Sequence, residues 1–224
     1  MGKYLHSKFG VETNTDTTRG QIEDYLPTDI AKVKKDGEEW REPNIKVSIK
    51  TTKFNGRWLD VPGNQYEHSD AYILVKIGIM REHFLGFLKA ISFLKDKLFV
   101  EATRIGELDK QQAQELWDEV PVFEPLPAYI SGFILKSETG RGIQKINAGL
   151  KGRKNKRIVI KQCVGLVSPE ILRENNYLQA LDPSSSYAIS IEPIIDSLTN
   201  QHFFAHSGAL KWQENDWSEL VGKL

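Results

Sequence analysis

The sequence has little cysteine and no long apolar run. Cys163 is the one cysteine among 224 residues, which excludes an internal disulfide and a cysteine-based zinc site within one chain. No apolar run approaches the ~18–20 residues that cross a bilayer. The opening residues MGKYLHSKFG lack the apolar core of a signal peptide. We therefore expect a cytoplasmic protein with no membrane partner.

The formal net charge is zero, because 30 Lys and Arg balance 30 Asp and Glu. The balance hides an uneven distribution, since the stretch from Thr139 to Pro169 holds eight bases and no acid, and the remainder 22 bases against 30 acids. Local sign, and not total charge, governs the attraction of a polyanion. The bases of this segment are Arg141, Lys145, Lys151, Arg153, Lys154, Lys156, Arg157 and Lys161.

Composition and periodicity predict one α/β domain over residues 1–224. Apolar residues make up 40% and charged residues 27%, as in globular proteins, and the length suits a single core. Alternation and short apolar runs predict strands at residues 28–33, 44–52, 70–79, 128–136, 157–167, 186–192 and 201–206. Helical spacing and caps predict helices at residues 17–26, 82–98, 109–118 and from Ser168 onward. Loops are expected at 53–69 and, rich in bases and glycine, at 137–157.

The strand VSIKTTK, residues 47–53, carries the most informative side chains. Val47 and Ile49 alternate with Ser48 and Lys50, so the polar pair shares one face. We expect this strand to form a hairpin with residues 28–33. Neighbouring strands lie about 4.7–4.9 Å apart, which would bring Asp29 near the Ser48 and Lys50 face. An acid, an oxygen ligand and a lysine suit Mg²⁺-dependent hydrolysis of a phosphodiester.

The spacing and context of these residues resemble a known nuclease family. Pro27-Thr28-Asp29, eighteen further residues and then Ser48-Ile49-Lys50 resemble the PD-(D/E)XK core of Type II restriction endonucleases. The continuation IKTTKFNGRWLDVPGNQYEHSDAYILVKI is also similar, and the resemblance covers roughly residues 17–136. It implies a restriction-endonuclease-like core with a mixed central β-sheet flanked by helices, to which residues 137–224 add a basic loop and C-terminal strands for DNA recognition.

The resemblance also implies roles for individual residues. Asp29, a second acid and the backbone carbonyl of Ile49 would hold Mg²⁺, and Lys50 would position the attacking water. Ser48 departs from the pattern, because the family usually has Glu or Asp there and a hydroxyl is a weaker, uncharged ligand. The missing carboxylate would come from Glu23 on the preceding helix or from Glu67, seventeen residues after Lys50.

A restriction enzyme would act on double-stranded DNA as a homodimer, because two strands need two cuts and C2 symmetry presents two active sites. Phosphate contacts are expected from the basic segment, and base contacts from side chains such as Arg141, Gln144, Asn147 and Arg153. Residues 139–161 hold no aromatic side chain, which argues against a stacking platform for single strands.

Other interpretations remain open. One is a catalytically inactive nuclease-fold module that binds DNA within a larger complex, and another is a structure-specific nuclease acting on RNA or branched DNA. D-(x)n-S-x-K alone is common, and Ser48 and Lys50 would otherwise form the solvated face of a hairpin. Gln65 is either a polar loop residue or a group that orders a water at the site. The histidines at 68, 83, 202 and 206 lack a third zinc ligand, and HFFAH favours a strand.

Overall fold

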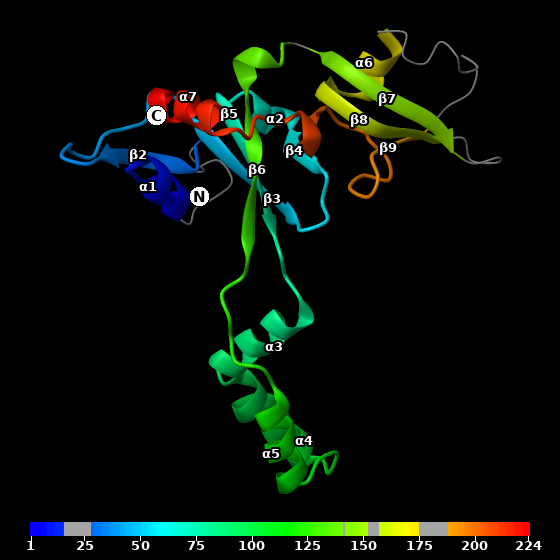
Figure 1. Ribbon diagram of the computed structural model, residues 1–224. Coiled ribbons are helices and arrows are strands. Elements are labelled where there is room, and N and C mark those ends of the chain that lie inside the picture. Colours follow the sequence, from blue (N-terminus) through cyan, green and yellow to red (C-terminus); the bar gives the residue numbers. More distant parts are fainter. Residues whose placement is uncertain (16–27, 141, 152–156, 175–187) are drawn as a thin grey trace. The chain divides into compact units, whose positions relative to one another are not determined.

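The computed structural model describes residues 1–15, 28–140, 142–151, 157–174 and 188–224 (Figure 1). The chain divides into two compact units. The first unit comprises Met1–Thr52, Gly56–Val75 and Ile130–Leu224, and the helical unit comprises Lys53–Asn55 and Lys76–Tyr129. The fold is mixed α and β, with sheets flanked by helices. The single domain predicted over residues 1–224 stays a prediction.

The largest sheet of the first unit has five strands in the order β4-β10-β8-β7, with β9 paired to β8. All pairs are antiparallel except β8 with β9. The strands are β4 (Trp58–Pro62), β7 (Ile143–Lys151), β8 (Arg157–Val167), β9 (Ala188–Ser190) and β10 (His202–His206). Two short helices accompany them, α2 (Gly63–Tyr66) and α6 (Pro169–Glu174). Ser168 caps α6 as predicted, because its Oγ accepts a hydrogen bond from the Ile171 N–H at 3.2 Å.

A second sheet has the order β3-β5-β6. Its strands are β3 (Val47–Lys53), β5 (Ala71–Ile77) and β6 (Ala128–Leu135). The continuous apolar run of β5 predicts a central strand covered on both faces, and this is confirmed, because β5 lies between the other two and its first five residues are buried. The chain enters the helical unit after Val75 and leaves it at Ile130.

A third, two-stranded sheet pairs β1 (Val11–Thr15) with β2 (Ile30–Lys35). It corrects the predicted hairpin, because β2 takes β1 as its partner and β3 lies beside β5. The polar strand VETNT gave no apolar alternation, which is why the sequence did not predict β1. The helix α1 (Gly2–Phe9) precedes β1, and its Tyr4 ring packs edge-on against Trp217 of α7 (Glu214–Lys223), with centroids 5.4 Å apart.

The core lies on both faces of β10, because successive strand residues point to opposite sides. Phe204 joins a cluster with Trp58 and Ile160. Phe203 joins another cluster, where its ring stacks on Tyr66 at 4.8 Å. Alternation therefore lets one short strand serve two apolar layers.

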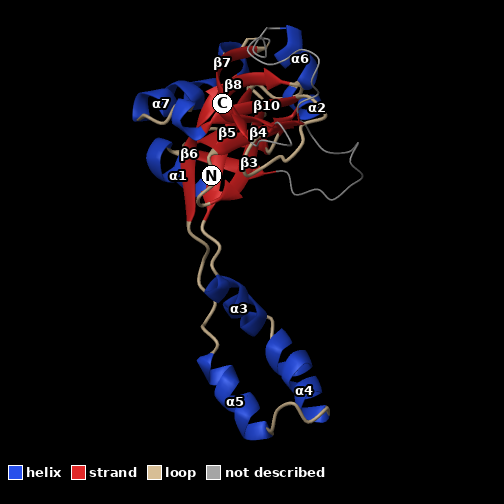
Figure 2. Cartoon of the chain, turned by 90° about the vertical axis from the view of Figure 1, so that its right-hand side faces the viewer, coloured by secondary structure: helices blue, strands red, loops and turns tan. Residues whose placement is uncertain are grey.

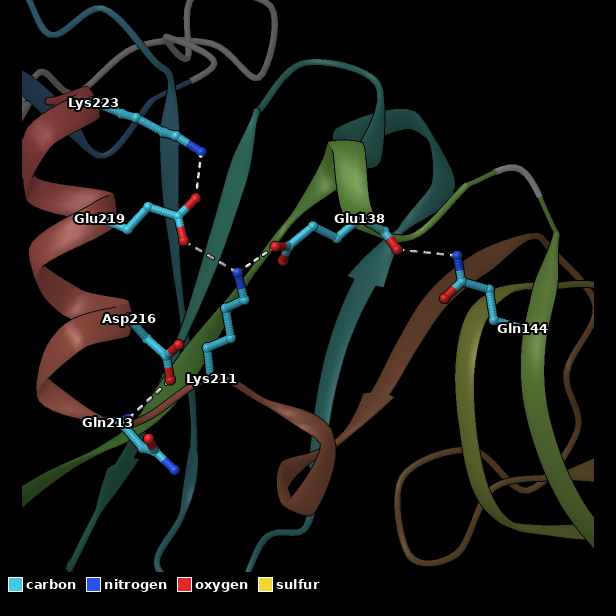
Figure 3. Close-up of polar contacts among 7 residues, drawn as sticks. All are labelled: Glu138, Gln144, Lys211, Gln213, Asp216, Glu219 and Lys223. Carbon is cyan, nitrogen blue, oxygen red and sulfur yellow. Dashed lines mark hydrogen bonds and ion pairs between the residues drawn. The ribbon is translucent and has the colours of Figure 1, made fainter.

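A polar network holds α7 to the short helix η3 (Lys136–Glu138) at the end of β6 (Figure 3). The Lys211 ammonium donates to the Glu138 carboxylate and contacts Glu219 at 3.5 Å, and Lys223 donates to Glu219 at 2.8 Å. The bond to Glu138 raises the pKa of Lys211, and the bond from Lys223 lowers the pKa of Glu219. The amide of Gln144 also donates to the Glu138 carbonyl, which links β7 to the network.

The helical unit contains α3 (Arg81–Ala90), the π-helix η2 (Leu94–Phe99), α4 (Val100–Arg104) and α5 (Lys110–Glu119) (Figure 2). The single helix predicted over 82–98 is therefore interrupted. Ser92 adopts a left-handed backbone conformation, with φ of 56°, which cannot continue a right-handed helix. None of the described helices is long and apolar enough to cross a bilayer.

Two predicted loops contain regular structure. Residues 137–157 include β7, which pairs with the next strand, the apolar β8, over most of its length, and packing against such a partner overrides a weak local pattern. Residues 53–69 include β4 and α2. Leu59 and Val61 of β4 are fully buried, but five residues between glycine-rich flanks are too few for a clear period. The predicted helix 17–26 lies outside the described residues.

Candidate active site

The start of the Asp29 segment is hydrogen-bonded to the start of β3. The Asp29 N–H donates to the Val47 carbonyl at 2.8 Å, and the Thr28 hydroxyl oxygen accepts from the Val47 N–H at 3.1 Å. These bonds bring Asp29 beside Ser48, as predicted, although the two strands form no continuous hairpin ladder. Thr28 therefore anchors the segment that carries the candidate metal ligand.

The Asp29 carboxylate is held by two groups of β3. The Ser48 hydroxyl donates to Asp29 Oδ2 at 3.3 Å, and the backbone N–H of Ile49 donates to the same oxygen. Ser48 is buried while Asp29 is exposed. The carboxylate is thus fixed by its inner oxygen and remains accessible to solvent and ligands.

Lys50 follows on the same strand and is partly buried. Its ammonium donates to Gln65 Oε1 at 2.7 Å, so Gln65, which lies on α2 and not in a loop, is a hydrogen-bond partner of Lys50. Desolvation lowers the pKa of Lys50, and the carboxylates of Asp29 and Asp60 act in the opposite direction. Both acids therefore lie within electrostatic range of this ammonium.

Asp60 is a residue that the sequence analysis missed. It lies on β4 between two buried residues, and its Oδ1 is 2.8 Å from Nδ1 of His202 on the paired strand β10. The His202 ring in turn stacks on Phe204, with centroids 5.5 Å apart. A carboxylate between Leu59 and Val61 on an otherwise apolar strand was the available signal. Its proximity to Lys50 depends on tertiary packing between β3 and β4, which belong to separate sheets, and no local pattern reveals that packing.

The structure describes one of the two acids proposed from the sequence. Glu23 lies outside the described residues. Glu67 is described, and its carboxylate accepts a hydrogen bond from Lys136 at 3.0 Å while its own backbone carbonyl accepts a second from the same ammonium. The structure thus pairs Glu67 with Lys136. Asp60, and not Glu67, is the described acid that acts together with Asp29 on Lys50.

The basic residues predicted to contact DNA are only partly described. Arg141, Arg153, Lys154 and Lys156 lie outside the described residues. Lys145 is exposed on β7. Lys151 pairs with Glu192 at 2.6 Å, and Arg157 lies 3.8 Å from Asp196. Two of the predicted phosphate ligands therefore already have acidic neighbours.

A groove of about 820 Å³ lies over β7 and β8. Asn147 and Gln162 line it and are direct cross-strand partners, and both side chains are exposed. The register shifts beside this pair, leaving Lys161 as an extra residue whose Nζ lies 3.5 Å from the position of a Cβ on Gly149. Amides and ammonium groups thus gather on one exposed ribbon.

Two of the four candidate histidines accept hydrogen bonds from the backbone. His83 Nδ1 accepts from the Met80 N–H at 3.2 Å, and His206 Nδ1 accepts from the Gly208 N–H at 3.3 Å. HFFAH forms strand β10 as predicted. Across the described ranges, no three His, Cys, Asp or Glu residues lie close enough to hold a metal by themselves.

Comparisons with known proteins identified no similar protein. No family model, no curated protein and no solved structure matches the chain.

Proposed function

We propose that the chain is a Mg²⁺-dependent endodeoxyribonuclease, most simply a Type II restriction enzyme that acts on double-stranded DNA. The observation that carries this proposal is the Asp29 carboxylate, which is exposed, fixed by Ser48 and the Ile49 N–H, and followed on the same strand by a desolvated lysine. An acid and a lysine on adjacent segments suit phosphodiester hydrolysis. The resemblance to the PD-(D/E)XK pattern supports the same assignment.

The available donors fit a magnesium ion. Mg²⁺ takes hard oxygen ligands, commonly one or two carboxylates together with waters and phosphate oxygens. Asp29 offers such a carboxylate, and the described contacts fall on its Oδ2 alone. Asp29, the Ile49 carbonyl and a second acid would hold the ion, which when bound lowers the pKa of a water and stabilises charge on the phosphoryl oxygens.

The remaining residues position groups around the phosphate. Lys50, held by Gln65 at 2.7 Å, would orient the attacking water and offset charge on the phosphate. Ser48 would fix the rotamer of Asp29. Among the described acids, Asp60 is our candidate for the carboxylate that Ser48 lacks, with His202 as its positioning partner. Glu23 remains a candidate from the sequence alone.

The β7–β8 ribbon is the proposed DNA-recognition element. A two-stranded ribbon fits the major groove, where Asn and Gln can each make bidentate hydrogen bonds to adenine. Asn147 and Gln162 lie opposite each other on the ribbon, while Lys145 and Lys161 would contact phosphates. Two copies related by C2 symmetry would read a palindrome and cut both strands.

Purified protein incubated with unmethylated plasmid and Mg²⁺ tests this proposal. Discrete fragments with one common end sequence are expected. Alanine at both Asn147 and Gln162 should relax the specificity at particular positions, while alanine at Lys145 and Lys161 should weaken binding to all sequences and reduce its salt dependence.

Ser48 itself favours a second candidate, because a hydroxyl stands where the family usually has an acid. In that case the chain is a DNA-binding module without catalysis. It would retain salt-dependent binding and leave plasmid intact in every divalent metal. Cleavage confined to branched or RNA substrates would instead indicate a structure-specific nuclease.

A further inference from the structure

The helical unit carries most of the exposed large apolar side chains of the described chain. Of the 18 large apolar side chains that are exposed, 15 belong to this unit. Met80, Phe84, Phe87 and Ile91 recur at helical spacing along α3 and its ends, so they share one face. The others are Phe54, Ile79, Phe93, Leu98, Val100, Ile105, Leu116, Val122, Phe123, Leu126 and Tyr129.

The unit lacks a core of its own. All of its residues are described, and only His83, Gly86 and Leu94 among them are buried. Neither α4 nor α5 contains a buried residue. A segment of this size needs apolar burial, a metal, a disulfide or a partner to be stable. Fifteen large side chains, each about half exposed, leave on the order of 1,000 Å² open, comparable to the ~800 Å² per partner of a standard interface.

The unit has two limbs, residues 81–104 with α3 and α4 and residues 109–124 with α5 (Figure 2). Polar and edge-on aromatic contacts join them. The Lys89 ammonium donates to the carbonyls of Trp117 and Val120 at 2.9 and 2.6 Å and lies over the Trp117 ring. Phe87 meets Phe123 edge-on at 6.3 Å. These contacts fix the hairpin and leave its apolar faces open.

The charges of the two limbs are opposite in sign. Residues 81–104 hold five Lys or Arg and three acids, whereas residues 109–124 hold one Lys and five acids. In an isologous dimer the same patch of both subunits forms the interface, so each contact between two residues occurs twice, with the roles of the subunits exchanged. A second copy in antiparallel orientation would therefore set each basic limb against an acidic limb. The acidic limb disfavours DNA as the occupant.

We propose that the helical unit is a homodimerisation element whose apolar faces are covered by the same unit of a second copy. Apolar burial supplies the affinity, and the pairing of the basic limb with the acidic limb fixes the orientation. This inference gives a surface to the homodimer of the proposed function. It concerns assembly only and is measured without DNA or metal.

Sedimentation equilibrium of the full chain tests the proposal. The wild type is expected at twice the 25.5 kDa of one chain at micromolar concentration. Phe84→Asp combined with Ile91→Asp should raise the dissociation constant at least 100-fold, because two carboxylates from each subunit would be buried at the interface. Trp212→Ser is the matched control, since Trp212 is also exposed but belongs to the first unit. A monomeric wild type, or dimers unaffected by the double variant, would overturn the proposal.

Charge reversal separates self-complementarity from loss of folding. Arg81→Glu with Lys97→Glu makes the first limb acidic, and Glu115→Lys, Glu119→Lys and Glu124→Lys together make the second limb basic. Each of these two charge variants alone should dissociate at least tenfold more readily than the wild type, and their equimolar mixture should recover the wild-type affinity, because both contacts again join opposite charges. Failure of the mixture to associate would contradict the limb pairing. Cleavage results leave this test untouched, and a monomer would leave the active-site proposal standing.

Discussion

Ser48 donates a hydrogen bond to the carboxylate of Asp29, and the oxygen atoms lie 3.3 Å apart. The same carboxylate oxygen accepts from the Ile49 N–H. Two consecutive residues of β3 thus hold Asp29, one through its side chain and one through its backbone. A carboxylate at position 48 could not donate in this way when ionised. The serine thus has a physical role as a donor that orients the candidate metal ligand.

Ser48→Asp should destabilise the metal-free protein by about 1–3 kcal/mol, because a second charge would be buried against Asp29. Excess Mg²⁺ should recover much of this loss, since a ligand at 100 times its dissociation constant stabilises the folded state by about 2.7 kcal/mol. Thermal unfolding with and without Mg²⁺ measures both effects. Ser48→Asn is the uncharged control, and an equal response of both variants to Mg²⁺ would argue against a cation at Asp29.

Asp60→Asn should reduce Mg²⁺-dependent cleavage at least 100-fold if this acid replaces the one that Ser48 lacks. Its carboxylate acts on Lys50 together with Asp29, whereas that of Glu67 is paired with Lys136. Glu67→Gln should therefore retain activity within about threefold, an estimate typical of residues outside a transition-state contact. Glu23→Gln completes the comparison. A large loss in Glu67→Gln with full activity in Asp60→Asn would reverse the assignment.

Lys50→Met should abolish cleavage yet raise thermal stability at neutral pH. Desolvation outweighs two attractive carboxylates and lowers the pKa of Lys50, so the folded state binds this proton less tightly than the unfolded state. The unfolding free energy of the wild type then rises with pH between the lowered pKa of Lys50 in the folded state and its value of 10.5 in the unfolded state. The extra stability of Lys50→Met over the wild type is therefore present below this pH range and is lost as the pH rises through it. Lys53→Met, at an exposed position of the same strand, should show no such pH dependence.

Gly165→Ala should cost about 2–4 kcal/mol of unfolding free energy. Gly165 has a φ of 135°, and a Cβ there would clash with the Gly142 carbonyl oxygen. Gly149→Ala on the paired strand is the control, because its Cβ would meet only the end of the Lys161 side chain at 3.5 Å. Denaturant titration compares the two. Equal stability of the two variants would show that the close approach between β7 and β8 is not required.

The elements with strong local patterns could be predicted from the sequence, and their partners could not. The buried run of β5 and the apolar strand β8 were placed within a few residues, because continuous apolar residues need cover on both faces. β7 was missed because its pairing with β8 supplies the stability that its own glycines and bases lack. The hairpin prediction failed because β2 pairs with a polar strand that precedes it in the chain.

The candidate site was also partly predictable, because some of its residues lie close together in the sequence and others do not. Asp29, Ser48 and Lys50 lie on segments whose spacing is visible in the chain, and the structure brings the first two into contact. The partners of Lys50 come from α2 and β4, through Gln65 and Asp60. Their approach to Lys50 depends on tertiary packing between elements outside its own sheet, and one sequence carries no local signal for that packing.

Cleavage rates of four proteins with Mg²⁺ and unmethylated plasmid test the central claim most directly. The wild type should cut, Asp29→Asn and Lys50→Ala should each lose at least 100-fold while keeping their fold and DNA affinity, and Lys53→Ala should match the wild type. Circular dichroism and a binding titration control for folding and DNA affinity. Undiminished cleavage by Asp29→Asn or Lys50→Ala would contradict the account, as would a wild type that binds the plasmid and never cuts it.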